Sequence, residues 1–425
     1  MLLSLPDFAL VLLIGVSGAG KSTFARAHFA PTEIISSDAC RGMVADDEND
    51  QSATADAFAL VRTILDLRLK RRRLCVVDAT SLYADDRLSL RLMGKRRYAP
   101  VIAVVLDPGR EVCIARDAAR RKRTVGADVI AAQGEALEQT LRRLSDEGFS
   151  AVHVLKSEQD IAEATFERIR PDSDERKRPG PFDIIGDVHG CAGELEIMLE
   201  RLGYAIAVET AADGEKRYRV TPPGGRTAVF LGDIVDRGPR IADTLRLVMD
   251  MVADGSALCV LGNHEVKLER WLEGKTVSVS HGLARSIVEL ERESPDFRAR
   301  VAAFIDKRPC HYVLDGGRLA VAHAGIREDM LNRFSGKVRS FCVYGDTDGT
   351  IGPDGKPVRR DWAAEYRGTT KIIYGHTPVE TPGWVNDTLC LDTGCVFGRK
   401  LSALRYPEME IVSIPAIRDW KTADI

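Results

Sequence analysis

The chain lacks any strong excess of charge of one sign. Its 425 residues carry 60 Lys and Arg against 63 Asp and Glu, a formal net charge of −3. This balance excludes a nucleic-acid binder that is basic throughout, so any nucleic-acid surface has to be a local patch. Long apolar runs are also missing, and none approaches the roughly 20 residues of a membrane-spanning helix. We therefore expect no membrane partner.

Paired cysteine spacings are absent as well. The nine cysteines are an odd number, and no two of them form a C-x-x-C pair. This pattern argues against a disulfide framework or a zinc ribbon and favours reduced thiols in the cytoplasm, where we expect the protein to reside. The N-terminus has no basic region, and the apolar run at residues 8–14 leads directly into a Gly-rich loop. We interpret that run as a buried strand and not as a signal peptide.

The chain is long enough for two or three domains. Residues 1–170 alternate short apolar runs with helical periodicity, which predicts an α/β fold with a parallel sheet and a last helical stretch near 160–169. Residues 171–181 are charged and Pro-rich, which is typical of a linker. A second α/β series fills residues 182–425. The expected strands are 9–14, 33–36, 74–78, 101–106 and 151–155 in the first domain, and 182–185, 228–231, 257–261, 319–322, 371–374 and 388–391 in the second.

The sequence GVSGAGKS follows the first expected strand and precedes a helical pattern. Its Gly15-x-x-x-x-Gly20-Lys21-Ser22 spacing is that of a phosphate-binding loop, in which glycines let backbone N–H groups approach phosphates at a helix N-terminus. Lys21 is expected to reach the β- and γ-phosphates of ATP, and Ser22 to bind Mg²⁺. The expected nucleotide-binding residues in this loop are Gly15, Ser17, Gly18, Gly20, Lys21, Ser22 and Thr23.

Three further residues follow expected strands of the same sheet. Asp38 lies at a strand end, where it could accept a proton from an attacking hydroxyl, and Arg41 one helical turn later could hold a phosphate of the acceptor. Asp38 could instead only cap the following helix. Asp78 ends another strand and is either a carboxylate near Mg²⁺ or a strand-end cap.

An arginine-rich segment lies between two helical patterns at residues 116–123. Such segments can form a lid that neutralises charge in phosphoryl transfer, and Arg116 and Arg123, seven residues apart, are the candidates for one helical face. Arg120 carries no assigned role, and Arg121 and Lys122 fit a solvated surface. The run of four basic residues at 70–73 fits a helix C-terminus at least as well as a nucleic-acid contact.

A second set of motifs occupies the later half: GDVHG at 186–190, GDIVDRG at 232–238 and GNHE at 262–265. Oxygen and imidazole ligands follow successive expected strands, a donor set that suits Mn²⁺, Fe²⁺ or Ni²⁺. Four of the eight histidines fall in such motifs. The expected metal ligands are Asp187, His189, Asp233, Asn263, His323 and His376.

Two-metal chemistry assigns roles to these residues. Asp233 would bridge two ions that polarise a phosphate ester and supply a hydroxide. His264 is placed to protonate the leaving oxygen, Arg237 to clamp the phosphate, and Asp236 to orient His264. Asp392 is either a further carboxylate of the site or a turn residue. Residues 266–310 and 325–370 carry no recognised motif and are expected to be helical or loop insertions that form one wall of this site.

The later motifs, together with His323-Ala-Gly and Gly375-His376-Thr-Pro, resemble the calcineurin-like metallophosphoesterases in their serine/threonine phosphatase and diadenosine tetraphosphatase branch. GVSGAGKS with SSDACR and the arginine lid resembles the polynucleotide kinase group of P-loop kinases. In this order, the two resemble the bacterial polynucleotide kinase-phosphatases of RNA repair over about residues 8–415.

This resemblance implies that the first domain phosphorylates 5′-OH ends with ATP and Mg²⁺, with Asp38 as general base and Arg41 as acceptor-phosphate ligand. The second would remove 2′,3′-cyclic phosphate and 2′- or 3′-phosphate ends with two divalent ions, Mn²⁺ or Ni²⁺. The implied partners are RNA or DNA ends, a ligase-type adenylyltransferase, a 3′-end RNA 2′-O-methyltransferase and a second copy in a homodimer. The family usually carries a C-terminal ligase-type domain, whereas this chain has no K-x-D-G motif, so it is expected to heal ends but not to seal them.

Two other functions fit the same motifs. One is a sugar or nucleoside kinase joined to a dinucleoside polyphosphatase or protein phosphatase. The other is a nucleotide-sensing P-loop that regulates a phosphatase without phosphorylating any acceptor. The sequence alone does not separate RNA from DNA as the substrate.

Overall fold

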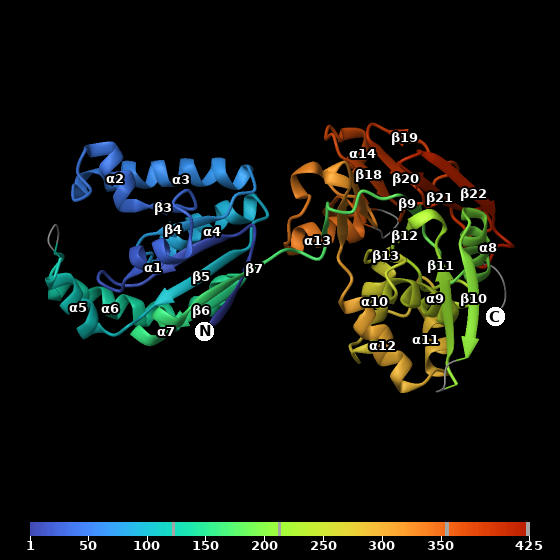
Figure 1. Ribbon diagram of the computed structural model, residues 1–425, viewed down its shortest axis with the longest axis horizontal. Helices are drawn as coiled ribbons and strands as arrows, with labels where there is room; N and C mark the ends of the chain where they lie inside the picture. The colour runs from blue at the N-terminus through green and yellow to red at the C-terminus, as the bar shows by residue number, and fades with distance from the viewer. Residues whose placement is uncertain (121–123, 211–213, 353–356, 422–425) are drawn as a thin grey trace. The chain divides into compact units, whose positions relative to one another are not determined.

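A computed structural model describes residues 1–120, 124–210, 214–352 and 357–421. The chain forms two compact units (Figure 1). The first unit comprises Met1–Pro171 with Arg333–Ser335, and the second comprises Asp172–Asn332 with Gly336–Ile425. None of the described helices combines the length and the apolar character needed to cross a membrane.

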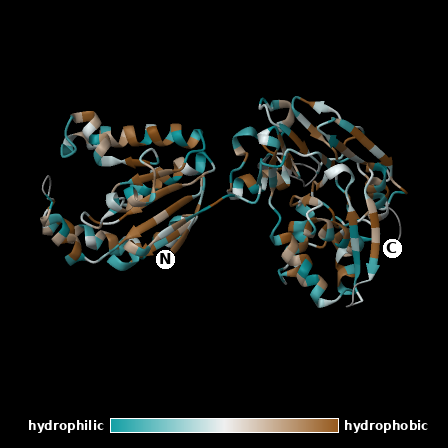
Figure 2. Cartoon of the chain, viewed as in Figure 1, coloured by the Kyte–Doolittle hydropathy of each residue, from teal (hydrophilic) through white to brown (hydrophobic). Residues whose placement is uncertain are grey.

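The first unit is built on a parallel five-stranded sheet of order β3-β4-β2-β5-β6. Its strands are nearly continuous apolar runs because helices cover both faces of the sheet. Figure 2 shows this concentration of hydrophobic residues in the strands. The strands are β2 (Leu10–Ile14), β3 (Ile34–Ser36), β4 (Cys75–Asp78), β5 (Val101–Leu106) and β6 (Ala151–Leu155). The mixed α/β class and the parallel N-terminal sheet expected from the sequence are confirmed.

Alternate residues of β2 face opposite layers of helices. Val11 and Leu13 join a core with α1, α5 and α6, whereas Leu10 and Leu12 join a core with α3 and α4. The helices are α1 (Lys21–His28), α2 (Ser37–Ala45), α3 (Thr54–Lys70), α4 (Ala84–Arg96), α5 (Arg110–Ala118), α6 (Ala127–Leu141) and α7 (Glu158–Glu163). The carboxyl ends of β2, β3 and β4 therefore open toward one edge of a rigid sheet, where ligands bind in folds of this kind.

The expected helix at 160–169 is wrong in its second half. Helix α7 ends at Glu163, and β7 (Thr165–Ile169) pairs in parallel with β1 (Leu2–Pro6). Leu3 and Leu5 of β1 are buried and their neighbours are not, so this strand has one covered face. The partner strand lies at the other end of the unit's sequence, and local periodicity cannot reveal such a pairing.

Part of the expected linker is paired. Strand β8 (Asp174–Glu175) lies beside β14 (His311–Leu314), and the amide of Asp315 donates to the carbonyl of Arg178 at 2.9 Å. These residues are an edge of the second unit, which differs from an unpaired linker over 171–181. Charged residues are common on edge strands, so the composition of such a strand resembles that of a loop.

Two large sheets form the centre of the described part of the second unit. One has the order β13-β12-β9-β21-β22, with β9, β12 and β13 parallel, and the other has the order β19-β20-β18-β15-β14-β8. A buried cluster that includes Phe182, Val229, Val321 and Leu389 joins residues of both sheets. The strands are β9 (Phe182–Ile185), β12 (Thr227–Phe230), β13 (Ala257–Cys259), β21 (Lys400–Tyr406), β22 (Glu410–Pro415), β15 (Leu319–Ala322), β18 (Lys371–Tyr374), β19 (Trp384–Val385) and β20 (Thr388–Cys390). This arrangement is the α/β sandwich that the motifs predicted.

Helices cover the outer face of the first of these sheets, where a second cluster packs. They are α8 (Ala192–Leu202), α9 (Ile241–Ala253), α10 (Asn263–Leu272), α11 (Leu283–Glu291) and α12 (Pro295–Asp306). Two antiparallel pairs, β10 (Ala205–Thr210) with β11 (Lys216–Thr221) and β16 (Thr347–Ile351) with β17 (Pro357–Arg359), and the helices α13 (Gly336–Tyr344) and α14 (Trp362–Glu365) complete the unit.

Candidate active sites

The phosphate-binding loop joins β2 to α1 in the first unit. Gly18 and Gly20 have φ of 83° and 96°, a region that side-chain-bearing residues rarely adopt. A Cβ on Gly18 would also lie 2.3 Å from the carbonyl oxygen of Cys113. Lys21 folds back over the loop, and its Nζ donates to the carbonyl oxygens of Gly15 and Val16 at 2.8 and 2.9 Å. The loop is therefore held open around a buried ammonium group.

Burial sets the acidity of this ammonium group. It lowers the pKa of Lys21 from 10.5 to about 8, although the charge of Asp78 opposes the shift. Burial raises the pKa of Asp78, which lies close enough to Ser22 and Lys21 to be affected by both. Asp78 thus stands beside the expected Mg²⁺ residue Ser22, in the surroundings expected of a carboxylate near that ion.

Nucleotide affinity should fall as pH rises above about 8. Below the pKa of free Lys21 the ammonium is present in both free and bound enzyme, so pH has no effect through this group. Above this pKa, Lys21 of the free enzyme has lost its proton. A bound triphosphate favours the charged ammonium form of Lys21, so nucleotide binding must take up a proton. The affinity for ATP should then fall by up to about tenfold per pH unit. Calorimetry in buffers of different ionisation enthalpy would measure the proton uptake, and an affinity that stays constant from pH 7 to 9.5 would contradict it.

Asp38 does not cap helix α2. The side chain of Ser36 accepts from the amide of Ala39 and fills that role. Asp38 is largely exposed, and its Oδ1 accepts from Nη1 of Arg41 at 2.6 Å. Arg41 is buried and also donates to the carbonyl of Glu48, and its Nε has no hydrogen-bond partner in the part of the chain that the structure describes. The pair is therefore available at a cleft rather than used to hold the helix.

A cleft of about 640 Å³ brings the expected kinase residues together. Lys21, Ser22, Asp38 and Arg41 all line it, and so does Asp78. The arrangement can hold a nucleotide at the loop, an acceptor hydroxyl at Asp38 and an acceptor phosphate at Arg41.

The arginines of the expected lid lie differently. Arg120, to which the sequence analysis gave no role, lines the cleft and pairs with Asp117 at 3.3 Å. It therefore lies at the nucleotide site. Arg116 reaches the carbonyl of Ala19 at 3.4 Å and pairs with Glu158 at 2.5 Å. Arg123 lies outside the described residues.

The second site lies at strand ends of both sheets of the second unit. Asp187, Asp233 and Asn263 follow β9, β12 and β13, and His323 and His376 follow β15 and β18. Oδ2 of Asp233 lies 3.3 Å from Nε2 of His323, 3.6 Å from that of His189 and 3.9 Å from that of His264. Nε2 of His323 also lies 3.0 Å from Oδ1 of Asn263 and 2.9 Å from Nδ1 of His376. The expected ligands converge around Asp233.

Backbone hydrogen bonds to His189 and His323 fix which nitrogen of each ring faces the site. Nδ1 of His189 and of His323 each donate to a backbone carbonyl at 2.9 Å, those of Val235 and Leu231. Nε2 is therefore the nitrogen of each ring that faces the centre and, once deprotonated, offers a lone pair there, as metal-binding imidazoles do. Burial alone would lower the pKa of His323, but the charge of Asp233 raises it to about 10. This raised pKa means that His323 holds a proton on Nε2 beside Asp233 when no metal is bound. A bound cation would replace that proton as the positive charge beside Asp233.

Two buried ligand atoms in the cluster have no hydrogen-bond partner among the described residues: Oδ1 of Asp187 and Nε2 of His376. An unpaired buried polar atom is costly, and a cation would satisfy both. Carboxylate, amide and imidazole donors around one shared carboxylate fit two divalent ions, which would polarise a phosphate ester. Burial and the charge of Asp392 raise the pKa of Asp187 well above its usual value, so Asp392 belongs to the electrostatics of this site.

Strained backbone aims several of these side chains. His189, Asp233, Asp236, Arg237 and His376 all have φ between 45° and 75°. Such conformations cost of order 1–3 kcal/mol each and persist only where surrounding structure imposes them. Their concentration in the loops after the strands fits a preorganised site.

Arg237 and His264 form the side of the site expected to meet the leaving group. The guanidinium of Arg237 lies 2.7 Å from Nε2 of His189 and 3.0 Å from Nε2 of His264. Nδ1 of His264 is 2.5 Å from Oδ2 of Asp236. Ser286 of α11 donates to Asp236 and accepts from its amide. Helix α11 thus supplies a wall of the site, as expected for residues 266–310.

Glu265 is a positioning residue that the sequence analysis left without a role. Its carboxylate accepts from the amides of Asp233 at 2.8 Å, Ile234 at 2.8 Å and Gly262 at 3.0 Å. It therefore ties the loop that carries Asp233 to the loop that carries Asn263. Its place in the motif GNHE was the only signal in the sequence.

Replacing Glu265 with glutamine should weaken metal binding. The amide keeps one acceptor but turns an NH₂ group toward backbone donors, so the Asp233 loop loses its anchor. Loss of such an outer contact lowers metal affinity about 10–100-fold. Mn²⁺ titration of phosphoesterase activity would measure the shift, with Glu269→Gln on the same helix as the matched control. Equal Mn²⁺ affinities in the two variants would contradict the assignment.

The fold and the two sites define a P-loop domain that binds nucleotide, joined to a phosphoesterase that uses divalent metals. Residues 180–399 match the model of the calcineurin-like phosphoesterase family, and residues 10–144 match that of an AAA domain. The chain belongs to the calcineurin-like phosphoesterase family, and its first unit is a P-loop, kinase-like domain.

Relatives match the phosphoesterase half. The chain is 43% identical over 239 residues to the Bis(5′-nucleosyl)-tetraphosphatase PrpE (asymmetrical) of Anoxybacillus flavithermus, covering 55% of this chain and 94% of that protein. It is 42% identical to the protein of the same name from Bacillus subtilis, with the same coverage. Among solved structures, a gluconokinase from Sinorhizobium meliloti 1021 is 22% identical with a TM-score of 0.27, covering 37% of this chain and 88% of that one.

Proposed function

We propose that the chain heals nucleic-acid ends. The first unit transfers the γ-phosphate of ATP to a 5′-OH of RNA or DNA. The second removes 2′,3′-cyclic phosphate and 2′- or 3′-phosphate ends with Mn²⁺ or Ni²⁺ held by Asp233 and its neighbours. In the first unit, Asp38 takes the proton of the 5′-OH, Lys21 holds the transferred phosphate, and Arg41 binds the phosphate that follows the first nucleotide.

The length of the cleft in the first unit supports a polynucleotide, and not a small molecule, as the phosphate acceptor. A second hollow of about 570 Å³ shares Gln51, Thr54 and Phe58 with it. A third, of about 640 Å³, shares Arg62 and Ser89 with the second. The three form one track along α3 and α4 that begins at Asp38 and extends well beyond the space one nucleoside needs.

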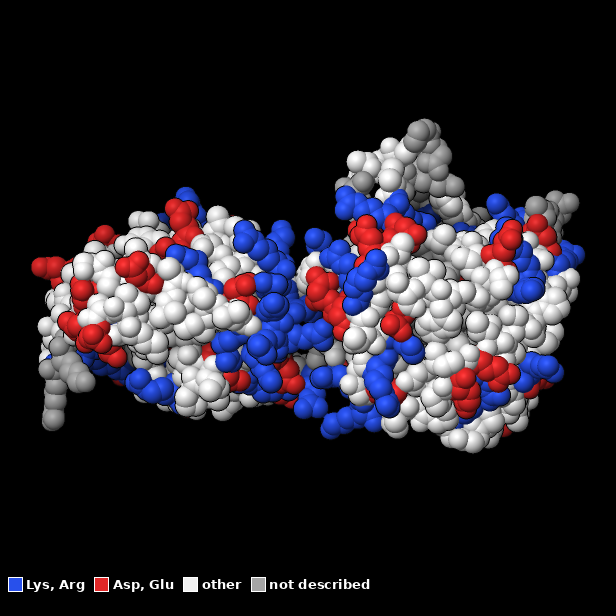
Figure 3. Space-filling view, turned by 90° about the horizontal axis from the view of Figure 1, so that it is seen from above, with Lys and Arg blue, Asp and Glu red and all other residues white. Residues whose placement is uncertain are grey.

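The side chains of the track suit a single strand. Phe58 is half-buried and offers a ring on which a base can stack. Arg62 and Arg96 are exposed, and neither makes an ion pair within the described chain. Figure 3 shows Lys and Arg side chains gathered on the first unit over the C-terminal part of α3. The basic run at 70–73 ends this helix, which adds positive charge at the far end of the track.

Labelled ATP and a 5′-OH, 2′,3′-cyclic-phosphate RNA test the proposal directly. We expect label on the 5′ end with Mg²⁺ and loss of the cyclic phosphate with Mn²⁺. A matched DNA and a panel of nucleosides and sugars serve as competing acceptors. Transfer to a small acceptor with none to RNA or DNA would overturn the kinase half of the proposal.

The double variant Arg62→Ala, Arg96→Ala should raise KM for long acceptors alone. Each arginine that is removed from a phosphate contact lowers the slope of log affinity against log salt concentration by about one. A nucleoside 3′-phosphate is too short to reach the track, so its binding should not change. We expect KM for a 12-nucleotide acceptor to rise about tenfold and kcat to stay near wild type. Arg142→Ala with Arg143→Ala, two exposed arginines outside these hollows, is the matched control. An equal effect on the nucleoside 3′-phosphate would contradict the track.

A second candidate concerns the phosphoesterase alone. The relatives that are 42–43% identical over this half are named as dinucleoside tetraphosphatases, so diadenosine tetraphosphate is the competing substrate. Its hydrolysis and that of the cyclic-phosphate RNA should be compared as kcat/KM in the same Mn²⁺ buffer. A higher value for the dinucleotide would assign the second unit to that substrate.

A further inference from the structure

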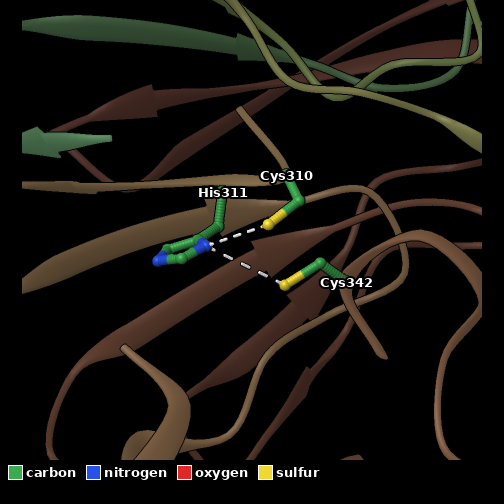
Figure 4. Close-up of side chains that lie close together, drawn as sticks. All are labelled: Cys310, His311 and Cys342. Atoms are coloured by element: carbon green, nitrogen blue, oxygen red, sulfur yellow. Dashed lines mark hydrogen bonds between the residues drawn. The ribbon is translucent and has the colours of Figure 1, made fainter. Parts of the chain in front are cut away.

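Two thiols and an imidazole meet in the second unit, outside the metal-binding cluster. Cys310 precedes β14, His311 begins it, and Cys342 lies on α13. Their sulfur atoms lie 3.4 and 4.0 Å from Nδ1 of His311. Figure 4 shows both sulfur atoms facing this one ring nitrogen. The cysteines are 32 positions apart in sequence, so the fold alone brings them together.

The hydrogen bond on the other side of the imidazole decides what this cluster can do. The amide of Asn332 donates to Nε2 of His311 at 3.0 Å, so Nε2 carries the lone pair and Nδ1 the proton of a neutral ring. An Nδ1–H faces the sulfurs as a donor and offers no lone pair to a metal. Only two thiols would then remain as ligands, which is fewer than a structural zinc site requires.

The same arrangement favours thiol chemistry. Hydrogen bonds from Cys342 and His311 hold the pKa of Cys310 well below its usual range, whereas burial raises the pKa of Cys342 well above it. Cys310 is partly exposed and Cys342 is fully buried. A reactive thiolate needs a nearby donor and an approach from solvent. Cys310 has both, and Cys342 stands within 4.8 Å as a second thiol.

We propose that Cys310 and Cys342 form a reversible disulfide in response to hydroperoxides and that this bond lowers phosphoesterase activity. The Cys310 thiolate attacks a peroxide oxygen, which forms an S–O bond, breaks the O–O bond and releases an alcohol or water after proton uptake. The Cys342 sulfur then attacks the sulfenic acid, which forms the S–S bond and releases the oxygen as water. Two thiols and one hydroperoxide give one disulfide, one alcohol and one water.

Backbone contacts connect this pair to the metal-binding loops. The amide of Leu261, two residues before Asn263, donates to the carbonyl of Pro309 beside Cys310 at 3.0 Å. The amide of Ala324, next to His323, donates to the carbonyl of Cys342 at 2.6 Å. A disulfide requires the sulfurs to approach to about 2.05 Å with defined dihedral angles. That approach moves the two segments that hold Asn263 and His323, whatever phosphate ester the site hydrolyses.

Peroxide treatment of the full-length, Mn²⁺-loaded enzyme tests this inference. Non-reducing peptide mass spectrometry should find a 310–342 cross-link, and hydrolysis of bis-p-nitrophenyl phosphate should fall at least tenfold and return with dithiothreitol. Nucleotide binding by the first unit should not change. This generic ester makes the result independent of the proposed end-healing substrate.

Variants separate the switch from general oxidation. Cys310→Ser and Cys342→Ser should each keep their activity in peroxide, while Cys259→Ala, a buried thiol elsewhere in the unit, should be inactivated like wild type. Either serine variant suffices if the other fails to fold. Inactivation of Cys310→Ser at the wild-type rate, a cross-link without loss of activity, or Zn²⁺ retained by this pair in stoichiometric amount would each overturn the proposal.

Discussion

Asp233→Asn should abolish phosphoesterase activity and leave the P-loop domain unaffected. Oδ2 of Asp233 lies among the Nε2 atoms of His189, His264 and His323, at 3.3 to 3.9 Å. The charges of these histidines, above all His323, hold its pKa well below the usual range although burial acts in the opposite direction. Its charge is therefore the negative centre that two cations would share.

Asparagine keeps the shape and removes this charge. Oδ1 of Asp233 accepts from the amide of His264 at 3.1 Å, and the asparagine oxygen can accept the same hydrogen bond, so the loop should keep its conformation. Removing one partner of a buried charge cluster costs about 3–5 kcal/mol, which corresponds to roughly a 10²–10³-fold or larger loss of metal affinity. Hydrolysis of bis-p-nitrophenyl phosphate should fall by about the same factor at limiting Mn²⁺.

The measurement has an internal control, because the same preparation can be assayed for ATP binding. A variant that binds ATP normally, unfolds like wild type and has lost Mn²⁺ affinity supports a shared ligand. Hydrolysis within about twofold of wild type at every Mn²⁺ concentration, a difference worth only about 0.4 kcal/mol, would show that Asp233 does not bridge the ions.

The strands that could be predicted are those whose own residues show the pattern of a buried strand. The strands β4, β9 and β12, which end at or shortly before Asp78, Asp187 and Asp233, are short and almost entirely buried runs, so their boundaries were predicted to within about a residue or two. Strands β1, β7, β8, β10, β11, β14, β16, β17, β19, β21 and β22 were missed, and β16 and β17 lie within the stretch 325–370 that was expected to be helix or loop. All of them except β19 pair with a partner distant in sequence or with another missed strand, and periodicity within one segment says nothing about such partners.

The same distinction holds at the sites. Residues at strand ends, such as Asp38 and His323, were expected there because parallel strands bring their carboxyl ends to one edge. Tertiary packing decides which groups the side chains of Glu265, Ser286 and Arg120 contact. Ser286 bonds to Asp236 fifty positions away, and nothing in the helix that carries it predicts this contact. The expected metal ligands thus lie in short sequence motifs and could be predicted. The contacts that orient them join residues far apart in sequence and could not.

Asp38→Asn should remove phosphoryl transfer while the acceptor still binds. Asn keeps an oxygen that can accept from Arg41, so the pair that lines the cleft survives, but an amide cannot take the proton of the attacking hydroxyl. Loss of a general base costs about 10²–10⁴-fold in kcat. KM for the acceptor should change little, because Arg41 and the track along α3 still hold it.

Arg41→Lys is the complementary change. The ammonium cannot reproduce the planar guanidinium, which donates to both Asp38 and the carbonyl of Glu48, so KM for a phosphate-bearing acceptor should rise more than kcat falls. Steady-state kinetics on the two variants with one 5′-OH acceptor would show opposite patterns, with the phosphoesterase rate as a common control. If Asp38→Asn instead raised KM and left kcat unchanged, Asp38 would only bind the acceptor, and the general base would have to be one of the other two carboxylates that line the cleft, Asp78 or Glu48.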